Sequence, residues 1–350
     1  VFFFLEVFGW LTSSVIPQRS SRVSCSVYPA SRCQALRTKL AAYHRIGREA
    51  VLCGNGAAEL IFLIVQAKRP KRALLIAPSF LEYEQALKAA GCGLSWVDLK
   101  EEEDFALSVP ELLAHLKEAE AAGQRPDILF LCNPNNPTGF AVEREALIPL
   151  LEYCEECGIV CVVDECFIEF LDEPERFSVM KELRSGRFRR LFILKAFTKL
   201  YAMAGLRLGY GISLDRELLE AMDGCRQPWS VSGPAQSAGE AALGETEYVN
   251  RARELVKRER SWLKAQMEGL GLYVYDSRAN YLFFRDPAQA RARTPESRSL
   301  YDACLKNGVL IRSCANYRGL DGRFYRICVK DRANNETFIR VLKKAMEERD

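Results

Sequence analysis

The sequence predicts an α/β fold: a large domain with a mostly parallel sheet covered by helices, followed by a smaller α+β domain. Two observations predict it. From about residue 36 to residue 225, short apolar segments alternate with longer segments of helical character, which is the pattern of strand–helix–strand units. After Pro228 the composition changes to a long, highly charged segment and several short strands. A chain of 350 residues, 49% of them hydrophobic and 27% charged, can bury a core in each domain.

The alternation can be followed element by element along the large domain. Short apolar runs that stop at proline or a polar residue are predicted strands, and longer runs of helical periodicity are predicted helices. The order is helix 57–67, strand 73–77, helix 81–90, strand 94–97, helix 109–121, strand 128–132, helix 143–157, strand 159–164 and strand 191–194. Polar motifs follow several of these strands. We expect those motifs to share a site, because open α/β sheets bind ligands at the carboxyl ends of their strands.

The C-terminal part is predicted to form the smaller domain. Helices are expected at residues 235–243 and 248–269, strands at 273–275, 281–284, 309–311 and 324–329, and a closing helix from Glu336. The longer of the first two helices is long enough to connect two domains. We therefore expect an N-terminal arm at residues 1–29, a large domain at residues 30–245 and a small domain at residues 246–350.

Composition and charge argue against several classes of function. The net charge is +3, and basic residues are interleaved with acidic ones, so no nucleic-acid partner is predicted. The apolar opening at residues 1–11 is interrupted by Glu6 and is shorter than the roughly 20 residues that a membrane span needs. The 13 cysteines are scattered through hydrophobic stretches. This pattern predicts free thiols and a cytoplasmic protein without a membrane partner.

One group of cysteines has a spacing that resembles a metal site. Cys154, Cys157 and Cys161 follow the pattern C-x2-C-x3-C, and Cys166 is the only near candidate for a fourth ligand. The first two fall on a predicted helix and the third on the following strand. We predict no metal site here, and the sequence leaves the role of the cluster open.

The segment at residues 194–211, LKAFTKLYAMAGLRLGYG, has the features of a covalent cofactor site. It follows a predicted strand, places Lys199 directly after Thr198, and places Arg207 eight positions later among small residues. A half-desolvated lysine can form an imine, and a nearby arginine can neutralise a phosphate. Pyridoxal phosphate needs both groups.

Three further motifs carry polar groups at predicted strand ends. Gly54-Asn-Gly56 is a glycine turn that opens a helix, and a helix N-terminus offers free N–H groups to an anion. Residues 133–139, NPNNPTG, form a stiff turn that displays asparagine amides. Asp164 ends a very apolar strand and must find a cationic or hydrogen-bonding partner. A protonated pyridine nitrogen is such a partner.

Taken in order, these motifs resemble the aminotransferase superfamily of pyridoxal phosphate enzymes, fold type I. The motifs are GNGAAE, NPNNPTG, VVDEC, FTKLYAMAGLRLGYG and FYRICV, and the resemblance extends from about Tyr28 to the C-terminus. It implies that fold, pyridoxal 5'-phosphate as the cofactor and a small phosphorylated amino acid as the substrate. It also implies a homodimer with shared active sites, in which Tyr28 would reach the cofactor phosphate of the neighbouring subunit.

The resemblance implies a role for each motif residue. Lys199 would form the imine, Asp164 would keep the pyridine nitrogen protonated, and Asn136 would bond the ring hydroxyl and contact the substrate. Phe80 would stack on the ring. The cofactor phosphate would be held by Gly56, Ala57, Ala58, Thr198 and Arg207.

Within the superfamily, the phrases QPWSVSGPAQ, ANYLFFR and GVLIRSCANYRGLDGRFYRICV resemble L-threonine O-3-phosphate decarboxylases of cobalamin synthesis. In that family Arg326 would bind the substrate carboxylate and Arg312 the substrate phosphate. The product would be (R)-1-aminopropan-2-yl phosphate. Two alternatives stay open: a histidinol-phosphate or related aminotransferase, and a catalytically silent protein of the same fold. The chain departs from many relatives at Phe167, where a tyrosine is common, and in residues 1–27, where the family's substrate-covering arm is not recognisable.

Overall fold

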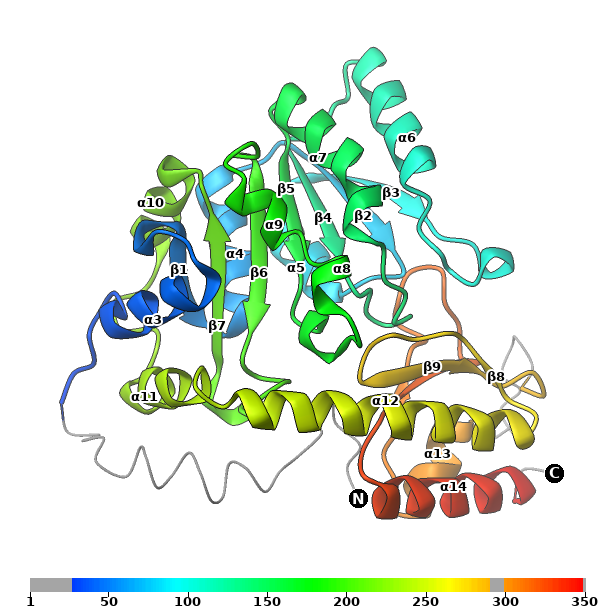
Figure 1. The fold of residues 1–350 in the computed structure, drawn as a ribbon. Helices are drawn as coiled ribbons and strands as arrows, with labels where there is room; N and C mark the ends of the chain where they lie inside the picture. The colour runs from blue at the N-terminus through cyan, green and yellow to red at the C-terminus, as the bar shows by residue number, and fades with distance from the viewer. Residues whose placement is uncertain (1–26, 290–298, 349–350) are drawn as a thin grey trace.

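The computed structural model describes residues 27–289 and 299–348, and it confirms the predicted α/β fold class (Figure 1). The chain forms a seven-stranded sheet and a separate four-stranded sheet. Most of the predicted N-terminal arm, and the apolar opening of the chain, lie outside the described residues. In the described part of the chain, no helix is both long enough and apolar enough to cross a membrane.

The large sheet brings the carboxyl ends of six strands to the same side. Its strands are β1 (Val51–Asn55), β2 (Arg72–Ala77), β3 (Gly93–Asp98), β4 (Ile128–Cys132), β5 (Val160–Asp164), β6 (Leu191–Ala196) and β7 (Leu208–Ser213). Their order in the sheet is β1-β7-β6-β5-β4-β2-β3. Only β7 runs antiparallel to its neighbours, so the other six strands point the same way. Their carboxyl ends carry the polar motifs, as the sequence predicts.

Successive residues of each strand point to opposite faces of this sheet. Both faces are covered by helices. Leu129 and Leu131 of β4 pack into one core, and Ile128 and Phe130 pack into the other. The first core includes residues of α3 (Gln34–His44), α6 (Val109–Ala121), α7 (Arg144–Cys157) and α11 (Gly233–Ala242). The second includes residues of α4 (Gly56–Lys68), α5 (Leu81–Ala89) and α10 (Arg216–Cys225). Shorter helices are α8 (Pro174–Phe177), α9 (Met180–Arg184) and the turns η1 (Arg48–Ala50), η2 (Glu101–Glu103), η3 (Ile168–Phe170) and η4 (Ala204–Leu206).

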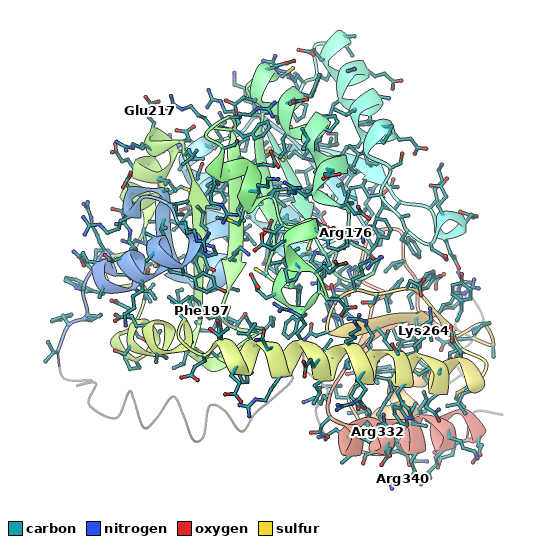
Figure 2. The ribbon with its side chains drawn as sticks, viewed as in Figure 1. Arg176, Phe197, Glu217, Lys264, Arg332 and Arg340 are labelled. Atoms are coloured by element: carbon teal, nitrogen blue, oxygen red, sulfur yellow. The ribbon has the colours of Figure 1, made fainter. Side chains whose placement is uncertain are left out.

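The small sheet is antiparallel and lies beside the long helix α12 (Thr246–Gly269), which runs from the large sheet to the small one (Figure 1). Its strands, in sheet order, are β10 (Arg312–Ser313), β11 (Phe324–Cys328), β9 (Tyr281–Arg285) and β8 (Tyr273–Val274). Helices α13 (Leu300–Lys306) and α14 (Arg332–Glu347) complete its core. Glu217 on α10 and Arg340 on α14 lie on outer surfaces, whereas Phe197 is buried (Figure 2).

Several predicted elements differ from the structure. The strand expected at 309–311 is displaced: Val309 and Ile311 are buried, but β10 begins at Arg312. The closing helix begins at Arg332 rather than Glu336, because the Asp331 side chain accepts a hydrogen bond from the backbone N–H of Asn334. Strand β7 was not predicted, and the strand expected before Gly54, β1, was given no bounds. Both contain glycine, which weakens the strand pattern.

Candidate active site

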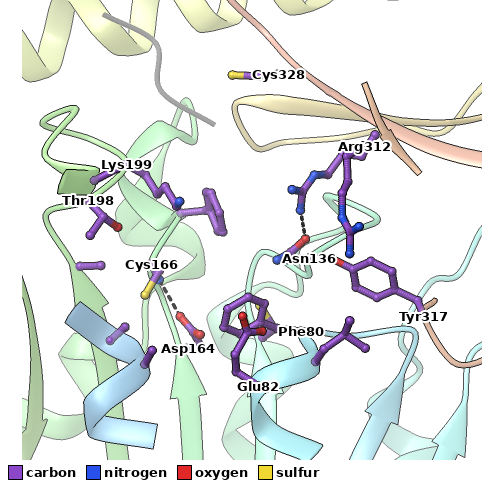
Figure 3. Close-up of a pocket in the computed structure, with 18 of the residues that line it drawn as sticks. Phe80, Glu82, Asn136, Asp164, Cys166, Thr198, Lys199, Arg312, Tyr317 and Cys328 are labelled. Atoms are coloured by element: carbon purple, nitrogen blue, oxygen red, sulfur yellow. Dashed lines mark hydrogen bonds between the residues drawn. The ribbon is translucent and has the colours of Figure 1, made fainter. Parts of the chain in front are cut away.

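A cavity of about 670 Å³ lies at the carboxyl edge of the large sheet and is closed on its other side by strands of the small sheet (Figure 3). Ten of the twelve predicted site residues line it: Ala57, Ala58, Phe80, Asn136, Asp164, Thr198, Lys199, Arg207, Arg312 and Arg326. They come from elements that are far apart in the sequence. The structure therefore brings together nearly all of the groups that the motifs suggested.

Asp164 ends β5 at the floor of the cavity and is buried. Its Oδ1 accepts a hydrogen bond of 2.9 Å from the backbone N–H of Cys166, and its Oδ2 accepts one of 2.6 Å from the Tyr83 hydroxyl. Burial raises the pKa of Asp164, although these hydrogen bonds oppose the shift. Among the described residues, no cationic side chain lies within ion-pair distance of this carboxylate. A protonated ring nitrogen fits this position, because it would supply the missing positive charge.

An anion cradle is formed where α4 begins beside β7. Gly56 has φ of 78°, and a Cβ added there would lie 2.9 Å from Arg207 Nη2, so the guanidinium rests directly against this glycine. At Gly209 an added Cβ would lie 2.5 Å from the backbone nitrogen of Ala57. Only glycine permits this approach between β7 and the first turn of α4. The free N–H groups of that turn and the guanidinium suit a phosphate, and the buried Thr198 lines the same cavity.

Lys199 and Phe80 enter the cavity from separate elements (Figure 3). Lys199 lies in the turn that follows β6, and its half-buried side chain points into the cavity. Phe80 directly precedes α5, and its ring meets the Tyr83 ring edge to face, with the centroids 5.5 Å apart. Tyr83 thus supports both Phe80 and Asp164. A flat aromatic ring bound above Asp164 would have Phe80 available for stacking.

The small sheet contributes two arginines that are direct partners in its ladder. Arg312 on β10 is paired with Arg326 on β11, and both line the cavity. Arg326 donates a hydrogen bond to Asn136 Oδ1 and lies over the Tyr281 ring, 5.2 Å from its centroid. Arg312 Nη2 donates to Asn316 Oδ1 at 2.9 Å. The two guanidinium groups therefore face the cavity side by side and can bind two anionic groups of one ligand.

Two predicted site residues do not line the cavity. Gly56 lies behind it, against Arg207. The Tyr28 side chain is exposed, and its ring packs against Trp229 with the centroids 4.9 Å apart. Within one chain Tyr28 has no place in the site, so its expected role in a neighbouring subunit stays a prediction.

Other lining residues were missed by the sequence analysis. They are Leu81, Glu82, Cys132, Cys166, Ala204, Tyr301, Leu310, Ile311, Ser313, Tyr317 and Cys328. One of them, Glu82, could have been found from the sequence. It lies two residues after Phe80, in the first turn of a helix that follows a predicted strand. Phe167, noted above as a departure from the family pattern, also lines the cavity, and its ring packs edge to face on Tyr281 at 5.1 Å.

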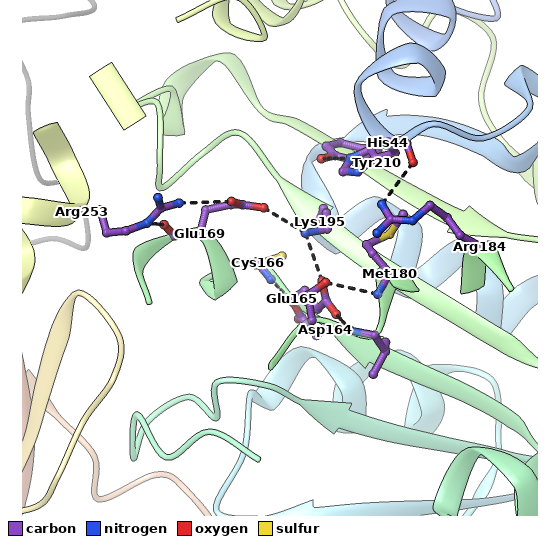
Figure 4. A network of polar contacts seen from close by, with 12 residues as sticks. His44, Asp164, Glu165, Cys166, Glu169, Met180, Arg184, Lys195, Tyr210 and Arg253 are labelled. Atoms are coloured by element: carbon purple, nitrogen blue, oxygen red, sulfur yellow. Dashed lines mark hydrogen bonds and ion pairs between the residues drawn. The ribbon is translucent and has the colours of Figure 1, made fainter. Parts of the chain in front are cut away.

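A buried charge network lies beside the cavity (Figure 4). Lys195 Nζ lies 3.0 Å from Glu165 Oε2 and 3.2 Å from Glu169 Oε1. Glu165 also accepts hydrogen bonds from the Ser178 hydroxyl at 2.8 Å and from the backbone N–H of Val179 at 2.7 Å. Burial lowers the pKa of Lys195, but the two carboxylates outweigh it and the net shift is upward. The network joins the ends of β5 and β6, which carry Asp164 and lead to Lys199.

The cysteine cluster forms no metal centre in residues 27–289 and 299–348, where no three potential metal ligands gather. Cys154 and Cys161 are both buried, and the neighbouring Cys161 thiol together with burial raises the pKa of Cys154. Cys157 lies apart, with its Sγ 3.7 Å from the Glu120 carboxylate. The thiols of Cys154 and Cys161 therefore act as core side chains.

Comparisons with known proteins agree with this geometry. The putative threonine-phosphate decarboxylase of Caldanaerobacter subterraneus subsp. tengcongensis is 34% identical over 327 residues, covering 93% of this chain and 85% of the relative. The histidinol-phosphate aminotransferase of Symbiobacterium thermophilum is 32% identical over 337 residues, covering 96% and 87%. Among solved structures, the histidinol-phosphate aminotransferase of Clostridium acetobutylicum superposes with a TM-score of 0.84 at 28% identity, covering 98% of this chain and 97% of that one.

The family model for aminotransferase class I and II matches residues 14–342, which is nearly the whole chain. The matched region contains every element that builds the cavity. The chain is a member of the aminotransferase class I and II family, whose enzymes depend on pyridoxal 5'-phosphate.

Proposed function

We propose that this enzyme decarboxylates L-threonine O-3-phosphate to (R)-1-aminopropan-2-yl phosphate. The observation that carries the proposal is the pairing of Arg312 with Arg326 across the small sheet, with both guanidinium groups in the cavity. The substrate has two anionic groups on neighbouring carbons, a carboxylate and a phosphate. Arg326 would bind the first and Arg312 the second, each through parallel N–H···O bonds. Histidinol phosphate has no carboxylate to occupy Arg326.

The other residues orient the cofactor in this proposal. The α4 N-terminus, Thr198 and Arg207 hold its phosphate, and Phe80 covers one face of its ring. When bound, pyridoxal phosphate supplies an aldehyde for the amine and a ring that accepts an electron pair from Cα. Asp164 stabilises the positive charge on the ring nitrogen, and the hydrogen bond from Tyr83 holds that carboxylate in place. The burial of Asp164 keeps water away from this charge.

Lys199 has a second role in this proposal, which is to transfer a proton to Cα. Its ε-amino group is displaced by the substrate amine and stays beside Cα, where its Nζ can deliver a proton. Loss of carbon dioxide leaves an electron pair on Cα, and protonation there by Nζ completes the exchange of a carboxyl group for hydrogen. Arg326 would determine which bond of Cα breaks, because by holding the carboxylate it sets how Cα is turned toward the cofactor.

An aminotransferase acting on histidinol phosphate or a related amino compound is the second candidate. The similarity to the Symbiobacterium histidinol-phosphate aminotransferase, 32% over 337 residues, favours it. The same Lys199 could then remove the proton from Cα. This reaction requires an amino acceptor such as 2-oxoglutarate, whereas decarboxylation requires none.

We also propose a homodimer in which sites are shared. Exposed aromatic side chains support it: the tilted rings of Tyr28 and Trp229 pack against each other at the surface, and both side chains are exposed. A second subunit would cover this apolar patch and bring Tyr28 to a neighbouring cofactor phosphate. The division into an arm, a large domain and a small domain is part of the same proposal.

The test is to incubate the holoenzyme with L-threonine O-3-phosphate, with and without 2-oxoglutarate, and to measure carbon dioxide and glutamate. We expect carbon dioxide in both mixtures. Glutamate formation would instead identify an aminotransferase, and failure to form the absorbance band of the lysine-bound cofactor would identify a silent protein. A Lys199→Ala variant should lose the absorbance band of the lysine-bound cofactor, whereas Lys257→Ala, a mostly exposed lysine on α12, should keep it.

A further inference from the structure

The carboxylate of Glu82 lies in the cavity, but the proposed reaction gives it no role. It lies in the first turn of α5, is half-buried, and projects into the cavity near Phe80 (Figure 3). The next acid of the same helix, Glu84, forms an ion pair with Lys88 at 2.5 Å. Glu82 forms no ion pair within the described residues, although cationic groups share its cavity. A half-buried acid without an ion-pair partner is available to a ligand in the cavity.

Charged groups from four elements line the same cavity as Glu82. Arg312 comes from β10, Arg326 from β11, Asp164 from β5 and Lys199 from the turn after β6. Burial raises the pKa of Glu82, and Asp164 adds to the rise, whereas Arg312 and Lys199 oppose it. A substrate phosphate on Arg312 would neutralise the opposing charge. Glu82 would then hold a proton more readily in the complex than in the free enzyme.

The number of oxygen atoms distinguishes a phosphate from a carboxylate at this place. A bidentate arginine occupies two oxygens of its partner. A carboxylate has no third oxygen, whereas a phosphate monoester has one left, and its second pKa of about 6 lets it share a proton near neutral pH. An alkyl carboxylate is ionised by then, with a pKa near 4.3. A second carboxylate would therefore be repelled by Glu82 without a compensating hydrogen bond.

We propose that Glu82 is a specificity-determining residue that selects a phosphate monoester over a carboxylate at the distal end of the substrate, by sharing one proton with the phosphate oxygen that Arg312 leaves free. The inference rests on the proposed assignment of Arg312 to the substrate phosphate. It also gives a reason why a dicarboxylic amino acceptor would bind poorly, which favours the lyase reaction.

The test is a rapid-mixing titration of the holoenzyme, read from the cofactor absorbance before carbon dioxide is released, with L-threonine O-3-phosphate (O-phospho-L-threonine) and with L-glutamate. For the wild type we expect tighter binding of O-phospho-L-threonine and a loss of its affinity, by up to about tenfold per pH unit, above neutral pH. In Glu82→Gln the amide donates a hydrogen bond at every pH, so this dependence should disappear. L-glutamate should bind about tenfold tighter to this variant, because the repulsion is gone.

Glu84→Gln is the matched control, because it removes an acid of the same helix that is already paired with Lys88. It should behave like the wild type. Glu82→Ala should also bind L-glutamate more tightly but O-phospho-L-threonine more weakly, so it tests the inference even where Glu82→Gln loads cofactor poorly. Unchanged discrimination and pH dependence in both Glu82 variants would overturn the inference. Because the titration measures binding, discrimination without carbon dioxide release would refute the proposed reaction and leave Glu82 as the selector.

Discussion

Two neighbouring acids at the end of β5 have opposite environments. Asp164 faces the cavity and has no cationic partner among the described residues, whereas Glu165 is fully buried and paired with Lys195 at 3.0 Å. Successive residues of a strand point to opposite sides, so the two carboxylates cannot exchange roles. The motif VVDEC indicated that an acid ends the strand. The sequence could not show that Tyr83 bonds this acid, because that contact depends on how α5 packs against β5.

The two acids should respond differently to loss of charge. Asp164→Asn should lower the catalytic rate by roughly 10²–10⁴-fold, because the positive charge on the ring nitrogen loses its partner. Glu165→Gln should keep the cofactor spectrum but lower the free energy of unfolding by roughly 3 kcal/mol, because it breaks a buried ion pair. Rate measurements and urea unfolding check both. A normal rate in Asp164→Asn would contradict the assignment.

Tyr83→Phe isolates the hydroxyl that donates to Asp164 Oδ2 at 2.6 Å. That bond favours the ionised carboxylate, so its loss should raise the pKa of Asp164 further and move the acid limb of the activity profile to higher pH. Stability should fall by about 1 kcal/mol. Tyr325→Phe, whose hydroxyl donates to Gln289 Oε1 at 2.8 Å in the small domain, is the control. An identical profile in the two variants would show that Tyr83 does not act on Asp164.

At the scale of elements, the site depends on how closely β7 approaches the start of α4. Strand β7 was not predicted and β1 was given no bounds, because GYG and CGN interrupt their apolar patterns. Gly209 of β7 makes the approach possible. The sequence therefore predicted an anion site at the glycine turn but could not show which strand packs against it. The displaced strand β10 has a similar cause: only two residues pair with β11, too few for a periodic signal.

Gly209→Ala tests this approach, because the new Cβ would meet the backbone of Ala57 at 2.5 Å. We expect a loss of about 1–3 kcal/mol in the free energy of unfolding and weaker cofactor binding, since the first turn of α4 must move. Gly224→Ala is the control: no atom lies within 4 Å of its new Cβ. Equal cofactor affinity in the two variants would contradict the role of β7.

At the scale of the whole molecule, the fold class, the strand-end location of the cavity and ten of the residues that line it were predictable. Those properties depend on local hydrophobic pattern and on motifs. Groups placed by tertiary packing, such as Glu82, Tyr83 and the Lys195 network, were not predictable in this way. The network joins the cavity to α12 through Glu169 and Arg253, whose Nε donates to the Glu169 carbonyl at 3.1 Å. These charged residues near the cavity thus also link the large sheet to α12, the helix that leads to the small sheet.

His44 makes the stability of the molecule depend on pH. Burial, with Lys195 and Arg184 nearby, lowers its pKa from 6.5 to about 3. The unfolded chain therefore binds a proton below pH 6.5 that the folded chain does not, and stability falls as the pH decreases from 6.5 toward 3. Between pH 7 and pH 5.5 this loss should be roughly 1 kcal/mol. In His44→Gln, urea unfolding should show a smaller loss over the same interval, and an equal loss would exclude His44 as its source.

The proposed function depends on the two paired arginines, which would make this site a decarboxylase of a phosphorylated amino acid. The most direct measurement is the product formed from L-threonine O-3-phosphate in deuterium oxide, identified by nuclear magnetic resonance. The account predicts 1-aminopropan-2-yl phosphate with one deuterium on the carbon that carried the carboxylate. Recovered substrate that has exchanged its Cα hydrogen for deuterium and kept its carboxylate, or a 2-oxo acid product, would contradict it.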